Sequence, residues 1–350
     1  MKLVRSLFIF SDKHNRRVPG HHGPHLHPAA RATLAALAVA ATAFGAEAAE
    51  IAYPTRPIRM IVPFPPGGSA DPLARAFAAW FADKFGVAVV ADNRPGAGTA
   101  IAHTMAARAT PDGHTLLLGS STGLATNAAL GSKLDYDPLK DFAFVGMAAH
   151  VPQLLVVHAS LSAKNLGELI EMTKAQPGKI FAGSPGVGTV GHLAVEMLNQ
   201  RSGSKFGHVP YKGMGPAVID LLGNRIQLAI GSVTGSQPQI AAGRLRAIAT
   251  SHFERLRSMP TVPAIAETLP GYTGNGWYGI VAPAGTPAPI IKKLHAEMSR
   301  ALATPEFSKQ IEFLGMEPVN RTSPQEFREW VRSELTHWTK VVRDAGITPP

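Results

Sequence analysis

Residues 58–71 read IRMIVPFPPGGSAD, and this stretch decides the fold. Its first seven residues are apolar apart from one arginine and are typical of a buried β-strand. Residues 67–69, Gly-Gly-Ser, then predict a tight turn, and Asp71 and Pro72 predict the N-cap and first residue of a helix. Backbone N–H groups at a helix N-terminus bind anions without the help of a side chain. The stretch therefore predicts a strand, a turn and a helix that together hold a carboxylate or a phosphate.

A second stretch of the same kind lies beyond the midpoint of the chain. Residues 184–192 read SPGVGTVGH, and they follow a short apolar run and open a helix-length segment. Two separate turns can then offer backbone amides to one anion. This pair of turns indicates a binding protein with two lobes.

Composition and periodicity predict an α/β protein. The chain has 350 residues, of which 45% are apolar and 17% are charged, which suits two globular lobes. From residue 58 onward, apolar runs of strand length alternate with amphipathic segments of helix length. The expected strands are residues 58–64, 87–91, 115–118, 154–158, 180–182, 205–209, 226–230, 245–250 and 278–282.

Two extended, proline-flanked segments mark the expected domain boundaries. Residues 147–158 and 277–283 suit a pair of strands that cross between two α/β domains, with the ligand in the cleft. The expected first lobe is residues 51–152, and the expected second lobe is residues 153–276. Residues 277–350 then return to the first lobe, with helices expected at 289–303, 305–314 and 324–345.

The first 48 residues have the features of an export signal. Six Lys and Arg residues precede an apolar run at 33–45, and Ala46-Glu47-Ala48 is an A-x-A cleavage site. The apolar run is too short to span a bilayer, which takes roughly 20 residues. We therefore expect cleavage of residues 1–48 near Ala48 and a periplasmic protein, and this removal lowers the formal net charge from +10 to +6.

Several kinds of partner are disfavoured. Lys and Arg are scattered along the chain rather than gathered in a stripe, so nucleic-acid binding has little support. The absence of cysteine excludes disulfides, thiol catalysis and a lipid anchor on an N-terminal Cys. Five histidines lie in the leader and are lost with it. We expect no metal, no cofactor and no catalytic residue, and we expect a monomer.

A dinucleotide site is one alternative. Gly186, Gly188 and Gly191 match the G-x-G-x-x-G fingerprint, which follows a strand and opens a helix. The fingerprint needs an acidic residue about 20 positions further on to hold the ribose. Residues 206–214 read FGHVPYKGM and contain no Asp or Glu. NAD binding is therefore disfavoured.

A secreted serine hydrolase is the main enzymatic alternative. Residues 119–123 read GSSTG and match the G-x-S-x-G nucleophile elbow, with Ser121 as the nucleophile. Asp220 and His252 follow in the order that the α/β-hydrolase fold uses. No HGGG-type oxyanion segment precedes them, and the pattern is short. The motifs therefore favour a binding protein over an enzyme.

From about Tyr53 to the C-terminus, the sequence resembles one known family in a series of segments that occur in order. The segments are VPFPPGGSAD, DNRPGAGT, PDGHTLLLGS, SPGVGTVGHL, VPYKGMGPAVIDLLGNRI, GRLRAIATS, PTVPAIAE, WYGIVAPAGTPAPIIKKL and LGMEP…SPQEF…W…VVRDAGI. As a set they resemble the Bug (Bordetella uptake gene) receptors, the substrate-binding proteins of tripartite tricarboxylate transporters.

The resemblance implies a two-lobed, type II-like periplasmic binding protein that closes on a small carboxylate and passes it to membrane permease subunits. It also implies that backbone amides and hydroxyls hold the carboxylate. The ligand-binding residues carried over by motif are Gly67, Gly68, Ser69, Asp71, Ser120, Thr122, Ser184, Gly186, Gly188, Thr189 and His192, and Ser232 joins them on the cleft side. An orphan ligand sensor without a permease is a further alternative.

One segment departs from the family pattern and bears on the ligand. Many members have an acidic residue where this chain has Gln227, and an Asp or Asn where it has Gly231 and Ser232. No acidic group is then expected in the cleft to pair with an ammonium. We therefore expect a di- or tricarboxylate, or another organic acid without an amine, rather than an amino acid.

Overall fold

The structure is a computed structural model, and it describes residues 52–66, 68–319 and 322–347. The expected signal peptide, residues 1–48, lies outside the described residues. None of the helices in this described part is both long enough and apolar enough to cross a membrane.

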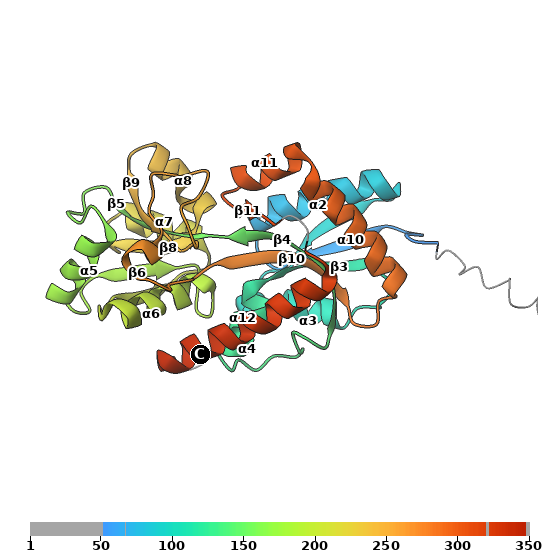
Figure 1. Ribbon diagram of the computed structural model, residues 1–350, viewed down its shortest axis with the longest axis horizontal. Coiled ribbons are helices and arrows are strands. Elements are labelled where there is room, and N and C mark those ends of the chain that lie inside the picture. The colour runs from blue at the N-terminus through green and yellow to red at the C-terminus, as the bar shows by residue number, and fades with distance from the viewer. Residues whose placement is uncertain (1–51, 67, 320–321, 348–350) are drawn as a thin grey trace, which may run out of the picture. The chain divides into compact units, whose positions relative to one another are not determined.

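A mixed six-stranded sheet is the first of two sheets (Figure 1). Its strand order is β11-β4-β10-β3-β1-β2. Strand β1 pairs in parallel with β2 and β3, and β10 runs antiparallel to β3 and β4. The strands are β1 (Ile58–Val62), β2 (Val89–Asn93), β3 (Thr115–Ser120), β4 (Phe142–Val151), β10 (Gly276–Pro283) and β11 (Glu317–Pro318).

The second sheet has five strands in the order β7-β6-β8-β5-β9. Strand β6 pairs in parallel with β7 and β8, and β5 runs antiparallel to β8 and β9. The strands are β5 (Gln153–His158), β6 (Phe181–Ser184), β7 (Gly207–Pro210), β8 (Leu228–Ser232) and β9 (Leu245–Thr250).

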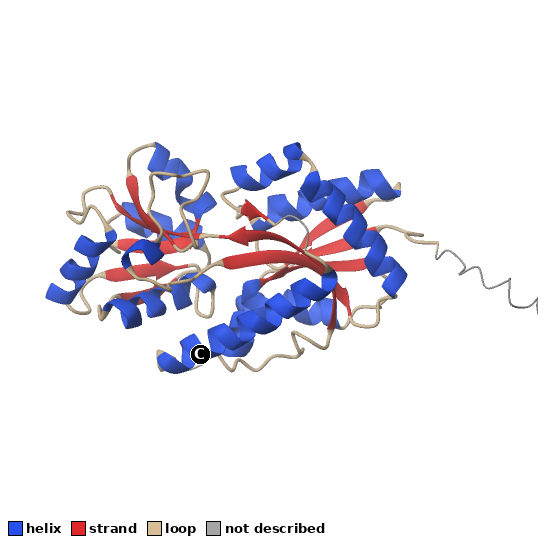
Figure 2. Cartoon of the chain, in the orientation of Figure 1, coloured by secondary structure: helices blue, strands red, loops and turns tan. Residues whose placement is uncertain are grey.

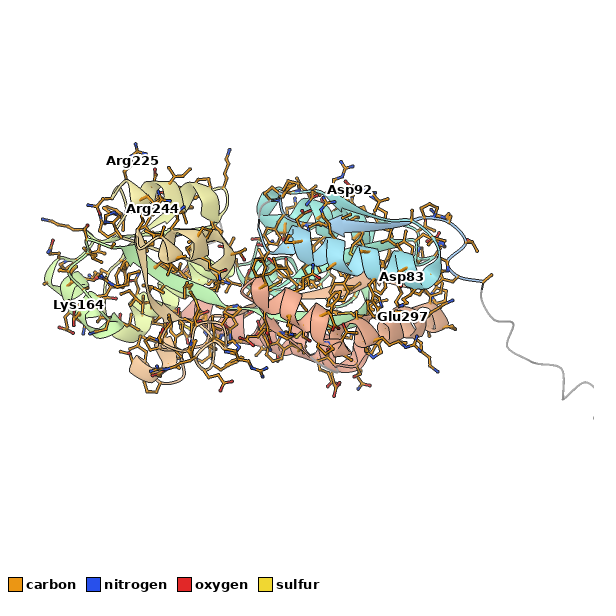
Figure 3. The ribbon with its side chains drawn as sticks, turned by 90° about the horizontal axis from the view of Figure 1, so that it is seen from above. Asp83, Asp92, Lys164, Arg225, Arg244 and Glu297 are labelled. Atoms are coloured by element: carbon orange, nitrogen blue, oxygen red, sulfur yellow. The ribbon has the colours of Figure 1, made fainter. Side chains whose placement is uncertain are left out.

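Helices lie on both sides of the strands (Figure 2). They are α2 (Ala70–Phe85), α3 (Ala100–Ala107), α4 (Asn127–Ala129), α5 (Leu166–Ala175), α6 (Val190–Ser202), α7 (Met214–Leu222), α8 (Val233–Ala241), α9 (Ile265–Thr268), α10 (Ala288–Ala303), α11 (Pro305–Phe313) and α12 (Pro324–Asp344). A 3₁₀ turn, η1 (Ala97–Thr99), and a π-helical turn, η2 (Thr122–Thr126), complete the list. Charged side chains such as Arg225, Arg244, Lys164 and Asp83 are exposed (Figure 3).

The chain passes from one sheet to the other at two places. Strand β4 of the first sheet leads into β5 of the second with only Pro152 between them. The chain returns after β9, through residues 251–275, and enters β10 of the first sheet. The backbone connections between the sheets are therefore few.

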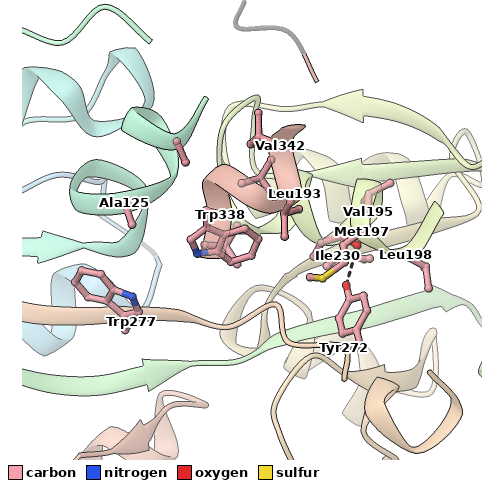
Figure 4. Packing of buried hydrophobic residues seen from close by; sticks show 14 of the residues in the cluster. Ala125, Leu193, Val195, Met197, Leu198, Ile230, Tyr272, Trp277, Trp338 and Val342 are labelled. Atoms are coloured by element: carbon pink, nitrogen blue, oxygen red, sulfur yellow. Dashed lines mark hydrogen bonds between the residues drawn. The ribbon is translucent and has the colours of Figure 1, made fainter. Parts of the chain in front are cut away.

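One apolar cluster includes side chains from both sheets and from the C-terminal helix. Trp338 of α12 belongs to the same cluster as Leu193 of α6 and Ala125 of η2 (Figure 4). Trp277 of β10 and Trp338 both donate their indole N–H to Oε2 of Glu334, at 3.0 and 3.1 Å. Burial raises the pKa of Glu334, and the two indole bonds oppose that rise. Helix α12 is thereby joined to β10 by packing and by a shared acceptor.

The observed elements agree with the expected α/β pattern, since each of the nine expected strands overlaps an observed strand. The prediction that Asp71 caps helix α2 is wrong. The helix begins at Ala70 with Ser69 as its N-cap, and Asp71 is already helical. The carboxylate of Asp71 is engaged by Arg75, four residues further on, so it does not turn back to cap the backbone. The predicted stop at Gly86 is confirmed, because this residue is left-handed with φ of 69°.

Helix α12 packs closely on β10 at a glycine. A Cβ added at Gly279 of β10 would overlap the ring of Phe327 in α12 and would lie 2.7 Å from the backbone oxygen of Gly146. We expect Gly279→Ala to lower the free energy of unfolding by about 1–3 kcal/mol, because the backbone of β4 cannot yield. Chemical denaturation measures this change. The control is Gly223→Ala, where the nearest atoms lie at 3.6 Å; equal stability of the two variants would contradict the packing argument.

Candidate functional site

A cavity of about 490 Å³ lies where the ends of several strands meet. It is lined by the segments that follow β1, β3, β6, β7 and β8, together with Val151, Gln153 and residues 276–278. The strands β1 and β3 are parallel in the first sheet, and β6, β7 and β8 are parallel in the second. The carboxyl ends of parallel strands form the usual ligand-binding edge of an open α/β sheet. The cavity therefore lies where this fold class binds its ligands.

The segment after β1 brings Gly68 and Ser69 to the cavity. Ser69 is the N-cap of α2, and its side chain makes no capping hydrogen bond. Burial raises the pKa of Tyr278, another residue that lines the cavity, to about 12, and the hydroxyl of Ser69 opposes that rise. The remaining member of this predicted group, Gly67, lies outside the described residues.

Asp71 does not line the cavity, and it stabilises the segment between β1 and α2 from the side away from the cavity. Asn93 at the end of β2 donates from Nδ2 to the backbone oxygen of Phe64 at 3.0 Å and to Oδ1 of Asp71 at 2.9 Å. The hydrogen bond from Arg75, helped by that from Asn93, lowers the pKa of Asp71. Asp71 and Asn93 therefore fix the backbone between β1 and α2.

The segment after β3 contributes three hydroxyls, those of Ser120, Ser121 and Thr122. The Oγ atom of Ser120 accepts a hydrogen bond from the backbone N–H of Gly123 at 3.2 Å. The Oγ atom of Ser121 accepts one from the backbone N–H of Trp277 at 3.3 Å. Both hydroxyls therefore remain able to donate a hydrogen bond to a ligand.

The other members of the hydrolase alternative are engaged elsewhere. Asp220 accepts hydrogen bonds from the phenol of Tyr211 and from Arg225, at 2.8 and 2.7 Å. The ring of His252 lies 3.3 Å from the backbone oxygen of Glu254. Within the described ranges, no hydrogen bond joins Ser121 to either side chain. The structure does not assemble these three residues into a triad.

The segment after β6 divides into residues that line the cavity and residues behind them. Thr189 lines the cavity and caps α6, accepting from the backbone N–H of His192 at 3.4 Å. Ser184 lies behind the turn, where its Oγ atom accepts from the N–H of Gly186 at 3.2 Å. Gly186 and Gly188 have φ of 142° and 79°, which favour glycine. Of the residues predicted here, only Thr189 lines the cavity.

The turn between β6 and α6 also contacts the segment that follows β3 of the first sheet. The hydroxyl of Thr126 in η2 donates to the backbone oxygen of Gly188 at 2.6 Å. A Cβ on Gly188 would lie 3.1 Å from Leu130 and 3.2 Å from Asn127. The turn is thus held by residues that are far away in sequence.

His192 stabilises the turn between β6 and α6 and does not line the cavity. The backbone N–H of Gly188 donates to Nδ1 of His192 at 3.2 Å, and the His192 ring stacks on that of His208 with centroids 4.1 Å apart. The Nε2 atom of His208 lies 2.7 Å from Oγ of Ser184. Burial lowers the pKa of both histidines, to about 4 for His208, where neighbouring His192 adds to the effect.

Glu196 lies close to this histidine pair, so the group has the composition of a metal site. The possible ligand atoms of His192, Glu196 and His208 all lie within 4.8 Å of one another. The two rings are only 24° from parallel, so their in-plane lone pairs do not converge on one ion. Nδ1 of His192 is also occupied by the N–H of Gly188. The geometry therefore indicates that the two histidines support the turn between β6 and α6 rather than bind a metal.

Segments after β7 and β8 contribute cavity residues that the motifs did not identify. Residues 212–216 follow β7 and include Lys212, while Thr234 and Gly235 accompany the predicted Ser232 after β8. The rule that ligands meet the carboxyl ends of parallel strands would have found these segments, had it been applied to every strand. Gln227 points away, since its Oε1 atom accepts from the N–H of Phe181 at 2.9 Å.

The histidine pair predicts a pH dependence of stability. Because the pKa of His208 is about 4 in the folded protein and about 6.5 when unfolded, the unfolded chain binds more protons between these values. The contribution of His208 to the free energy of unfolding should therefore be fully present above about pH 6.5 and should be lost as the pH falls toward 4. We expect His208→Gln to show a smaller loss of melting temperature between pH 7.5 and pH 4.5 than the wild type. His158→Gln is the control, and equal losses in wild type and His208→Gln would contradict the assignment.

Comparisons with known proteins identify the family. The family model described as "Tripartite tricarboxylate transporter family receptor" matches residues 73–347. The Bordetella pertussis protein BugT is 38% identical over 84% of this chain and 90% of its own length. The solved structure of Rpa4515 from R. palustris with adipate is 35% identical and has a TM-score of 0.81, covering 85% of this chain and all of that one. MatC from Rhodopseudomonas palustris with bound malate is 32% identical, with a TM-score of 0.75 over 83% of this chain and all of its own. This chain therefore belongs to the receptor family of the tripartite tricarboxylate transporters.

Proposed function

We propose that the protein is a periplasmic solute-binding receptor that captures a small organic acid without an amine and delivers it to the membrane subunits of a tripartite tricarboxylate transporter. Adipate and malate, named with two solved relatives, are both dicarboxylates without an amine. The proposal includes removal of residues 1–48 on export.

The observation that carries the proposal is the convergence of helix N-termini on one cavity. Residues at or just before the first turns of α2, α6, α7 and α8 line it, and each helix presents the positive end of its dipole there. The hydroxyl-bearing residues Ser69, Ser120, Thr122, Thr189 and Ser232 line the same cavity. Burying a carboxylate is costly unless its lone pairs are satisfied, and these donors provide for that.

The same wall disfavours a ligand with an ammonium group. Among the described residues that line the cavity, none is Asp or Glu. Asp71 is turned toward Arg75 and Asn93 and does not line the cavity. An ammonium would lose its water there without gaining a counter-ion.

We further propose that residues 51–152 with 277–350, and residues 153–276, are two lobes that close on the ligand. Few backbone connections join the two sheets, and the cavity takes its lining from both. A ligand that contacts both walls favours the closed arrangement, because it interacts differently with the open and closed states. The predicted ligand residues Ser184, Gly186, Gly188, Asp71 and His192 then act by positioning the binding turns.

We propose a receptor without enzymatic activity. The bonds of Asp220 and His252 support this view, since both side chains are engaged away from Ser121. Hydrolysis of a simple ester by the purified protein, abolished by Ser121→Ala, would favour the hydrolase alternative. Genes for two membrane subunits beside this one would favour transport over a role as a sensor.

Thermal unfolding tests the ligand class. The purified protein is melted with mono-, di- and tricarboxylates, aromatic acids and amino acids. A ligand at 100 times its Kd adds about 2.7 kcal/mol to stability, which raises the melting temperature by a few degrees. We expect a selective shift with one class of carboxylate. Tight binding of aspartate or glutamate would refute the exclusion of amines.

The variant Gly68→Val tests the turn before α2. A Cβ at residue 68 meets no atom within 4 Å, so the fold has room for a side chain there. Because Gly68 lines the cavity, the added side chain should occupy ligand volume and weaken binding about ten-fold or more while unfolding stays cooperative. Calorimetric titration with the acid found above measures the loss. Gly223→Ala is again the control, and wild-type affinity in Gly68→Val would show that the turn is only structural.

A further inference from the structure

Lys212 is distinguished by its charge among the residues of the cavity. It follows β7 and precedes Gly213, the N-cap of α7, and its side chain is exposed. Of the described residues that line the cavity, it alone is Lys, Arg, His, Asp or Glu.

The backbone on both sides of Lys212 is fixed. The N–H of Tyr211 donates to the backbone oxygen of Ser184 at 3.0 Å, and the N–H of Gly213 donates to that of Pro185 at 2.9 Å. The phenol of Tyr211 is held by Asp220 at 2.8 Å. The Cα atom of Lys212 is therefore placed firmly beside the turn that precedes α6.

The ammonium of Lys212 is not neutralised by the protein. No carboxylate oxygen in the described ranges lies within 4.0 Å of it, in contrast to nearby Arg225, which pairs with Asp220 at 2.7 Å. The N-termini of α6, α7 and α8 add positive potential to the same wall. This wall therefore has an excess of positive charge, which favours an anionic ligand.

The opposite wall offers hydrogen-bond donors instead of a cation. There the N-terminus of α2 and the hydroxyls of Ser69 and of residues 120–122 line the cavity without a cation. Much of the remaining lining is apolar, including Phe64, Val151 and Met214. A ligand that satisfies both walls carries an anionic group at each end and an apolar body.

We propose that Lys212 determines specificity by pairing with a second anionic group of the ligand, so that the receptor selects organic diacids with an apolar spacer over the corresponding monoacids. The first carboxylate is held by the amides and hydroxyls at the N-terminus of α2. This inference rests on the proposed function and adds which chemical feature the site selects.

Matched acids test the inference by titration calorimetry. The probes are adipate against hexanoate, and terephthalate against benzoate. We expect the wild type to bind at least one diacid about ten-fold or more tightly than its monoacid, as a charge-assisted hydrogen bond permits. Lys212→Gln should weaken that diacid about ten-fold or more and change the monoacid less than about three-fold. Lys212→Arg should recover part of the diacid affinity, since the charge returns.

The control is Lys205→Gln, which removes an exposed positive charge that is not part of the cavity wall. It should bind the diacid like the wild type, which separates a local ion pair from the general field of the protein. An equal loss for diacid and monoacid in Lys212→Gln, or no loss for either, would overturn the role of Lys212 while carboxylate binding stands. Failure of every acid to bind the wild type would contradict the proposed function as well.

Discussion

The direction of the parallel strands is the constraint on which the rest of the structure depends. Because β1 and β3 run the same way in one sheet, and β6, β7 and β8 in the other, each set of strand ends opens on one edge. The helices that follow begin at that edge and present their unpaired N–H groups there. A binding site for anions thus arises from chain direction before any charged side chain is added.

The residues near the cavity divide into those that face it and those that hold the backbone in place. Asn93 and Asp71 fix the turn before α2, and His192 and Thr126 fix the turn before α6. Such supports keep donors in position without contacting the ligand, which is how a site made mostly of backbone amides gains its shape. Asn93, Thr126 and His192 each bond a backbone atom of a turn, and Asp71 in turn holds Asn93.

Much of the fold followed from the sequence, and less of the site did. Apolar runs and glycine turns located the strands within a few residues, since burial and turn geometry are local properties. The side of a turn on which a residue lies is set by distant partners: Ser184 faces His208, and Asp71 faces Asn93. Lys212 lies in VPYKGMGPAVIDLLGNRI, a segment that carries the family resemblance, but no glycine turn or cap motif marked it as a cavity residue. Its position becomes informative only when the two sheets bring their edges together.

The shared acceptor of Trp277 and Trp338 gives the molecule an optical property. Two of its four tryptophans donate to one half-buried carboxylate, that of Glu334, at the junction of β10 and α12. Indole emission depends on the polarity and the hydrogen bonds around the ring, so two of the four tryptophans should report on the surroundings of β10, which borders the cavity. If the two proposed lobes close on a ligand, movement at this strand would change this emission without an added dye.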